Sequence, residues 1–408
     1  IIQAPLILSL QVQILVTFLC SFEEKEFLIP VLEKTISATV YRYPDNSLDD
    51  VVQTIRELRR RSGQELLRLA MELSDLLWNI YPQLEKIICE IINKKSSENE
   101  NIVFNTFLLI ISQKSTNTQD EKVYYFQYII TKLVDTWNKT KSMFNLATFD
   151  GFFDFLGLQK ITQYIREYIF SNLLVKVIIE SKNIHSVQDL NTKYLDIQGK
   201  QLVDELKEIR KMFWPIRGFR KFADYHLKII SFENNNNNCL LKLWESVINF
   251  ILPDIFNIIR FKKLWSNNSS YMSIGSFSNF GSCFYKNPNL IQNIIESLFS
   301  DIKSLSLYTW SSILDFSISP LIIKCPYDYQ DNFLKVLLPY LFTEIDKKLI
   351  SEWSKIKEKE LISNDDFNNL AFCQNEDLSD EIIQELLLRH LSFITVKLLR
   401  ELLIPPNK

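Results

Sequence analysis

Glycine is scarce in this sequence, accounting for 7 of 408 residues. Hairpins and tight turns use glycine because it adopts positive φ without steric cost. The scarcity therefore argues against a β-rich fold, and no convincing pair of alternating strands appears along the chain. The apolar fraction, in contrast, is 47 %, enough to bury a large core. Together these features predict helices joined by short polar loops.

Residue clusters typical of metal sites and enzymes are also missing. No CxxC pair occurs, which argues against a zinc site. Most of the cysteines lie among apolar neighbours, and we expect them to be reduced core thiols. The histidines are few and far apart, and GxxxxGK[ST], GxGxxG and GxSxG motifs are absent. We therefore predict a binding protein that is not an enzyme, with no catalytic residues, no cofactor and no metal. The residues concerned are Cys20, Cys89, Cys239, Cys283, Cys325, Cys373, His185, His226 and His390.

Charge of one sign is not in excess. The 46 basic and 49 acidic residues leave a net charge of −3, so the chain as a whole lacks the basic footprint of a nucleic-acid-binding protein. Any binding to nucleic acid must come from local patches.

The first twenty residues are apolar, but they include Gln3, Gln11 and Gln13 and lack a basic n-region and a cleavage site. These amides favour a buried helix over a membrane-inserted one. Because the chain starts at Ile1, we expect it to begin inside a larger protein whose N-terminal portion is missing.

Apolar residues recur at one-turn spacing almost from end to end, for example at Phe27, Val31 and Ile36, and again from Ile382 to Leu398. Polar breaks separate these segments, so that helix pairs recur about every 35–45 residues, the period of HEAT-like repeats. We predict an all-α fold, a HEAT-like helical-repeat superhelix (α-solenoid) over residues 1–408. Two loops are expected within it: an Asn run at 234–238 and a long Ser/Asn-rich loop at 267–288. Trp244, Trp310 and Trp353 lie in apolar helical patterns and should be buried.

The first basic cluster contains Arg56, Arg59, Arg60 and Arg61. On a helix Arg56, Arg59 and Arg60 share one face, and gathered guanidinium groups suit phosphate oxygens. The alternative is a solvated face whose arginines pair with Glu57 and Glu65.

The second basic cluster surrounds Trp214-Pro215 and interleaves with phenylalanines at 213, 219 and 222. Such interleaving serves nucleic-acid binding in some proteins; alternatively, the aromatics are core and the cations solvated. Its candidate binding residues are Lys211, Arg217, Arg220 and Lys221, accompanied by Lys207, Arg210 and Lys228. A third run, Arg260 to Lys263, ends a helix and is expected to cap it.

The segment from Phe316 to Pro326 resembles the exportin-5 family: a helix end, a proline, an aliphatic run and then Cys-Pro. The segments after it, Tyr327–Leu341 and Lys348–Ile356, are similar to the family's next helices. An acidic insert at 364–380 and a helix with Leu387-Leu388-Arg389 follow. Upstream, Trp214-Pro215, Gly151 to Gly157 and Tyr81-Pro82-Gln83-Leu84 fall in the family's order. The resemblance covers about residues 50–400 and is strongest over 310–400. Two departures are the segment after Trp214-Pro215, where the family has a Gly-rich loop, and extra residues before Tyr81.

The resemblance implies a nuclear export receptor of the importin-β (karyopherin) superfamily. It implies as partners the GTP-bound form of the GTPase Ran, nucleoporins, and cargo that is structured RNA, such as microRNA precursors or tRNA, or protein. It also implies a monomeric receptor that shuttles between nucleus and cytoplasm without membrane insertion. The chain would correspond to middle and later repeats, without the N-terminal Ran-binding repeats. The alternative is a helical-repeat scaffold for protein interactions outside nuclear transport.

Overall fold

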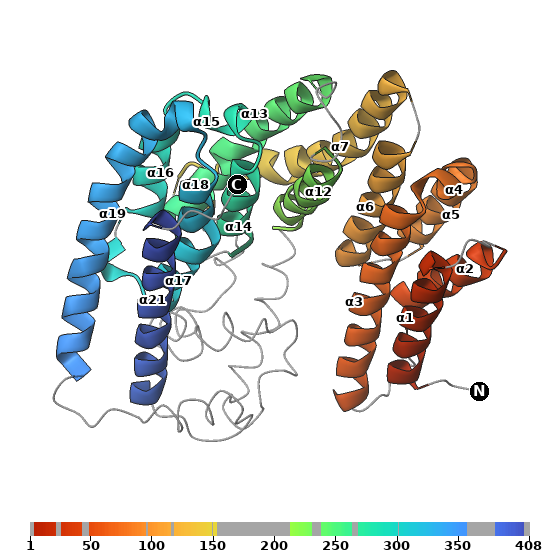
Figure 1. The fold of residues 1–408 in the computed structure, drawn as a ribbon, viewed down its shortest axis with the longest axis horizontal. Coiled ribbons are helices and arrows are strands. Elements are labelled where there is room, and N and C mark those ends of the chain that lie inside the picture. The colour runs from red at the N-terminus through yellow and green to blue at the C-terminus, as the bar shows by residue number, and fades with distance from the viewer. Residues whose placement is uncertain are drawn as a thin grey trace. The chain divides into compact units, whose positions relative to one another are not determined.

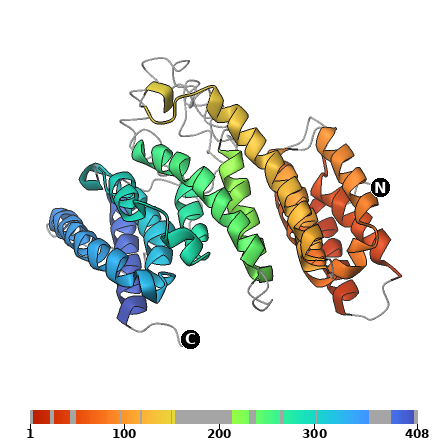
Figure 2. The ribbon, with the colours of Figure 1, turned by 90° about the horizontal axis from the view of Figure 1, so that it is seen from above.

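The computed structural model describes residues 4–21, 26–42, 49–94, 97–115, 118–148, 150–152, 213–230, 238–262, 268–300, 302–356 and 380–403. Within these residues all regular structure is helical, and no strand is found (Figures 1 and 2). The predicted all-α helical-repeat fold is confirmed. The chain divides into two compact units, residues 1–138 with 221–240 and residues 139–220 with 241–408.

The first unit is organised around a long helix, α3 (Asp49–Glu72), which packs against α1 (Pro5–Ser21), α2 (Leu28–Thr39) and α6 (Glu98–Lys114). Along α3 the buried positions follow one face and include Leu58, Leu66 and Leu69, each 0 % exposed. Two further helices, α4 (Ser74–Trp78) and α5 (Tyr81–Asn93), also pack on α6. Tyr81 and Pro82 open α5, where a proline costs no hydrogen bond.

The polar termini of two helices in this unit are closed by side chains. At the start of α6, Ser97 and Glu100 form a reciprocal capping box. At the start of α7 (Gln119–Ser142), Thr118 and Glu121 exchange hydrogen bonds in the same way. These caps satisfy backbone N–H groups that have no partner within the helix.

Among the described residues, the second unit contains several short helices and three of more than 20 residues, α13 (Asn238–Arg260), α19 (Tyr327–Ile356) and α21 (Asp380–Leu403). The elements that the structure describes there begin with α12 (Trp214–Ile230) and α13, each of which also contains residues of the first unit. They continue with α14 (Asn268–Ser278), α15 (Ser282–Tyr285), α16 (Leu290–Leu298), a 3₁₀ turn at Ile302–Ser304, α17 (Leu307–Ile313), a π-helical turn at Leu314–Ile318, α18 (Ser319–Ile323), α19 and α21. In Figure 1, α19 and α21 lie side by side. The helix α14 packs on the π-helical turn and on α18.

The prediction of a long loop at 267–288 is wrong. This stretch contains α14 and α15. Its small residues are buried rather than solvated: Ser270, Ser273 and Ser278 are each 0 % exposed. The Asn run at 234–238 lies outside the described residues except for Asn238, the first residue of α13.

Two of the three tryptophans are buried as predicted, Trp244 at 0 % and Trp310 at 1 % exposure. Trp353 is only partly buried; its indole N–H donates to Ser392 Oγ at 3.1 Å. An indole at a solvated edge keeps its ring packed while its polar end finds a partner.

The helix α1 keeps only one face in the core. Val12, Val16 and Leu19 are buried, whereas Leu10, Ile14 and three other large apolar residues (Leu6, Ile7 and Phe18) are more than half exposed. Among the described residues, no helix combines the length and hydrophobicity needed to cross a bilayer.

Candidate nucleic-acid interface

The four arginines of the first cluster lie on α3, beside the face that Leu58 and Ser62 bury. Their side chains differ in exposure: Arg60 is 58 % exposed, Arg61 36 % and Arg59 27 %. Arg56 is half-buried and also makes an interaction within the protein. The helix therefore brings the four together, but only Arg60 points mainly to solvent.

Glu57 holds two of these arginines. Arg60 binds it with both Nε and Nη2, at 2.8 and 2.7 Å, and Arg61 Nε binds the same carboxylate at 2.6 Å. Hydrogen bonds from Arg60 and Arg61 lower the pKa of Glu57 to about 2. One turn further along, Arg68 pairs with Glu65 at 3.5 Å. Both glutamates of the solvated-face alternative thus pair with arginines of α3.

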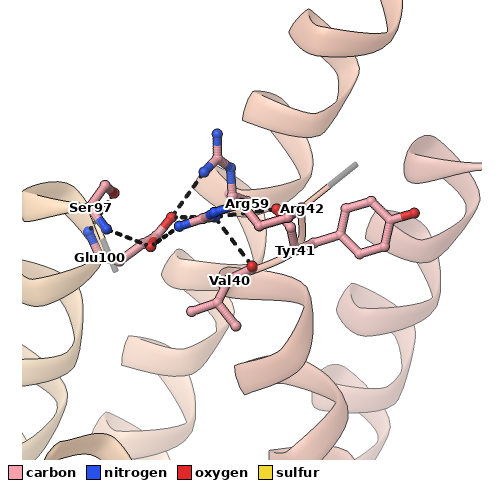
Figure 3. Close-up of polar contacts among 6 residues, drawn as sticks. All are labelled: Val40, Tyr41, Arg42, Arg59, Ser97 and Glu100. Carbon is pink, nitrogen blue, oxygen red and sulfur yellow. Dashed lines mark hydrogen bonds and ion pairs between the residues drawn. The ribbon is translucent and has the colours of Figure 1, made fainter. Parts of the chain in front are cut away.

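Arg59 takes part in a different network, shown in Figure 3. Its Nη1 donates to Glu100 Oε1 at 3.0 Å, and Arg42 binds both oxygens of the same carboxylate at 2.9 and 2.6 Å. The backbone N–H of Ser97 donates to Glu100 Oε2 at 2.9 Å. Arg42 also donates to the carbonyls of Val40 and Tyr41. This network joins the segment after α2, the middle of α3 and the start of α6.

The electrostatics of this network depend on a buried carboxylate, since Glu100 is 4 % exposed. Burial alone would raise the pKa of Glu100, but hydrogen bonds from Arg42 and Ser97 and the two guanidinium charges outweigh it. Its pKa therefore lies below the ordinary value. For Arg59, burial lowers the pKa and Glu100 opposes that shift. The guanidinium groups of Arg42 and Arg59 both bind the buried Glu100 carboxylate, so Arg59 has a structural partner and does not extend freely into solvent.

In the second cluster the described candidates lie on α12, and Lys211 lies outside the described residues. The guanidinium carbon of Arg217 lies 5.3 Å from the centre of the Trp214 ring. Burial lowers the pKa of Arg217, and the charge of Arg220 adds to this. Arg220 contacts the sulfur of Met272, and Lys221 is half-buried.

The phenylalanines that interleave with this second cluster are buried: Phe213 is 4 %, Phe219 0 % and Phe222 2 % exposed. Buried rings cannot stack on bases, so the aromatics belong to the core, as the alternative interpretation held. The cations of α12 border this core.

In the third basic run, Arg260 to Lys263, Lys262 caps a helix other than its own, and Lys263 lies outside the described residues. Lys262, 1 % exposed, donates from Nζ to Ser297 O at 2.7 Å and to Ser300 Oγ at 2.9 Å, at the end of α16. Arg260 pairs with Glu296 at 3.0 Å. An ammonium at the last carbonyls of a helix is favourable because of the helix dipole.

Sequence reasoning missed Arg42 and Glu100. The Ser97–Glu100 spacing is that of a capping box and could have identified the start of α6. Nothing local, however, indicated that the same carboxylate would receive Arg59 from 41 residues away. Within the described residues, no group of three or more His, Cys, Asp or Glu side chains could hold a metal ion.

Nearly the whole chain is similar to known proteins. The family model described as the Exportin-5 family matches residues 2–272 and 265–408. An uncharacterized protein of Schizosaccharomyces pombe is 26 % identical over 97 % of this chain, and Protein MSN5 of Saccharomyces cerevisiae is 25 % identical over 97 %. Human Exportin-5 is 18 % identical over 90 % of the chain. The chain spans about a third of each relative's length: 36 %, 36 % and 33 %, respectively.

Proposed function

The chain belongs to the exportin-5 family of nuclear export receptors, and on this premise we propose that it helps such a receptor bind its cargo together with Ran in its GTP-bound form. The cargo would be structured RNA, such as a microRNA precursor or tRNA, or protein. The full-length receptor would act as a monomer, contact nucleoporins and shuttle between nucleus and cytoplasm. Its work would be binding rather than catalysis.

The observation that supports this proposal is the family match, which extends over nearly the whole chain. The fold is compatible with this proposal because a helical-repeat protein offers an extended binding surface. Duplex RNA is recognised mainly by its shape and its phosphates, which such a surface can contact. The net charge of −3 requires that any RNA contact be local.

Within the first cluster we assign the cargo contacts to Arg56, Arg60 and Arg61. Arg60 and Arg61 are tied to Glu57 on their own helix, Arg60 in an exposed pair and Arg61 in a partly exposed one, and ion pairs at a helix surface contribute little to stability. A phosphate can therefore replace the carboxylate at small cost. Arg59 instead positions α3 through Glu100. The cations Arg217, Arg220 and Lys221 of α12 form a second candidate patch, to which we add Lys211, which lies outside the described residues.

The primary experiment is a pull-down with the full-length protein, with and without GTP-locked Ran, followed by identification of the bound RNA and protein. Cargo that is retained only with GTP-locked Ran supports the export function. Cargo binding that is indifferent to Ran would favour the alternative, a helical-repeat scaffold outside nuclear transport. The observation that favours this alternative is that Arg59, Arg60 and Arg61 pair with glutamates of the protein itself.

A second experiment tests the arginines. Replacing Arg56 and Arg60 by Gln in the full-length receptor should weaken binding to all RNA duplexes alike and flatten the salt dependence by about 0.7–0.9 per lost phosphate contact. Arg59 is left intact because its loss would disturb the Glu100 network. The control is Arg400→Gln, an exposed arginine of α21. If the RNA affinity and the salt slope equal those of the control, the cluster is a solvated helix face and does not bind RNA.

A further inference from the structure

A continuous group of aromatic rings crosses the surface of the first unit where α4, α5 and α7 meet. Trp78 lies 4.8 Å from Tyr81 and 5.3 Å from Tyr125, and Tyr125 lies 5.1 Å from Tyr124, measured between ring centres. The group runs outward from Tyr81, which is 1 % exposed, to Tyr124, which is 61 % exposed. The inner ring of Tyr125, which Trp78 contacts, packs against the outer ring of Tyr124 and restricts its position.

The outer end is a pair of parallel tyrosine rings. Tyr124 and Tyr128 stand one turn apart on α7, with ring centres 6.4 Å apart and planes inclined by only 7°. A flat group in van der Waals contact with both faces needs a gap of roughly 7 Å. Two parallel, exposed rings on adjacent turns can therefore hold one planar group between them once their side chains rotate to that separation.

A cation already uses one of these rings. Lys132, a further turn along α7, places Nζ 4.0 Å from the centre of the Tyr128 ring. Ring faces carry negative electrostatic potential and attract cations. The pair is thus suited to a planar cation, and the guanidinium of arginine is the planar cation among side chains.

The charge around the rings has the same sign throughout the inner part of the group. Glu85 on α5 makes no ion pair with any residue that the structure describes. It stands one turn after Tyr81 on α5, and the Tyr81 ring lies 5.0 Å from that of Tyr125, measured between ring centres. In keeping with this position, burial and then Glu85 raise the pKa of Tyr125, and the same two causes raise the pKa of Tyr81. Glu121 adds a second carboxylate beside Tyr125. Carboxylates attract a guanidinium and repel the phosphates of an RNA strand.

We propose that Tyr124 and Tyr128 clamp an arginine side chain of a protein partner, with Glu85 as the counter-charge. The partner segment would be a basic peptide that carries at least one exposed arginine. These residues lie on helices other than α3, which carries the arginine cluster, and the inference does not depend on the export function.

The test uses the complete chain and a fluorescein-labelled peptide of alternating arginine and glycine, followed by fluorescence polarisation. Matched peptides carry citrulline or lysine in place of arginine, and a labelled oligouridine serves as the RNA probe. The variants are Tyr124→Ala with Tyr128→Ala, Tyr124→Phe with Tyr128→Phe, and Glu85→Gln. Tyr327→Ala, an 86 % exposed tyrosine of the second unit, controls for the loss of any surface ring.

The arginine peptide should bind more tightly than the lysine peptide, and the citrulline peptide should not bind. The double alanine variant should lose about 5- to 30-fold in affinity, from two exposed cation–π contacts. The double phenylalanine variant should retain affinity because it keeps both rings, and Glu85→Gln should weaken binding a few-fold. Circular dichroism confirms that each variant is folded. Peptide affinity unchanged in the double alanine variant would overturn the proposal. So would an absence of binding, or oligouridine binding that depends on the two tyrosines.

Discussion

Replacing Gly275 by alanine should destabilise the second unit, because a methyl group at this position meets a backbone atom. A Cβ built on Gly275 would lie 2.3 Å from the carbonyl oxygen of Phe316 and 3.1 Å from Pro320 Cγ. The close approach has a cause in the sequence. Pro320 has no N–H, so it cannot donate to the carbonyl four residues earlier, that of Phe316. That carbonyl lies in the π-helical turn, and α14 packs against it.

Two effects of opposite sign decide the magnitude. Alanine favours a helix over glycine by about 1 kcal/mol. Carbon and carbonyl oxygen approach no closer than about 3.3 Å, so α14 and the π-helical turn must separate by about 1 Å. Overpacking of this kind costs about 1–3 kcal/mol and occasionally more. The clash is with backbone, which cannot rotate away, so we take the upper end of this cost, about 3 kcal/mol. Subtracting the helix preference of alanine, about 1 kcal/mol, leaves a net loss in the free energy of unfolding of about 2 kcal/mol.

Gly63 supplies the matched control. It is also inside a helix, but a Cβ there would meet side-chain atoms, Val103 Cγ1 at 3.3 Å and Thr39 Cγ2 at 3.9 Å. Gly63→Ala should therefore be neutral or stabilise by up to about 1 kcal/mol. Urea unfolding followed by circular dichroism measures both variants, and hydrogen exchange should show faster opening of α14 only for Gly275→Ala. Equal stability of the two variants would refute the packing argument.

Three further outcomes are expected. Glu100→Gln should lower the free energy of unfolding by about 2–3 kcal/mol, less than for a fully buried pair because Arg42 is 47 % exposed; urea unfolding beside Arg400→Gln measures it. Because the folded pKa of Glu100 is lowered, its contribution is complete above the unfolded pKa of about 4.3 and is lost as pH falls through the folded value. The parent should therefore lose stability more steeply in this acid range than Glu100→Gln does. Equal slopes for the two proteins would contradict the assignment. Trp310→Ala should cost about 3–5 kcal/mol, since its ring is buried and its N–H donates to Ile302 O at 2.8 Å; a thermal unfolding midpoint close to that of the parent would contradict this.

The helical fold could be predicted from sequence because its apolar spacing is local. The region 267–288 could not, because its structure depends on neighbours. Ser270, Ser273 and Gly275 are poor helix formers in isolation and resemble a loop. In the folded chain their small size lets α14 approach the π-helical turn, so tertiary packing overrides intrinsic preference.

The candidate site was predictable only in part. Pairing of Arg60 and Arg61 with Glu57 involves neighbours on one helix and follows from the spacing. The contact of Arg59 with Glu100 joins two helices, so it required the fold. For the second cluster, no local pattern told whether Phe219 and Phe222 faced the core or solvent.

The three adjacent arginines of α3, Arg59, Arg60 and Arg61, should differ in how freely evolution can replace them. Arg60 and Arg61 are bound to a carboxylate on their own helix, so their exchange alters surface charge and leaves the packing of helices intact. Arg59 shares a buried carboxylate with Arg42, and its exchange disturbs three chain segments at once. Packing therefore does not constrain the charge at positions 60 and 61, where only cargo binding would, whereas a basic residue should be kept at 59 wherever an acid is kept at 100. One short stretch of helix thus combines a tunable surface with a fixed internal joint.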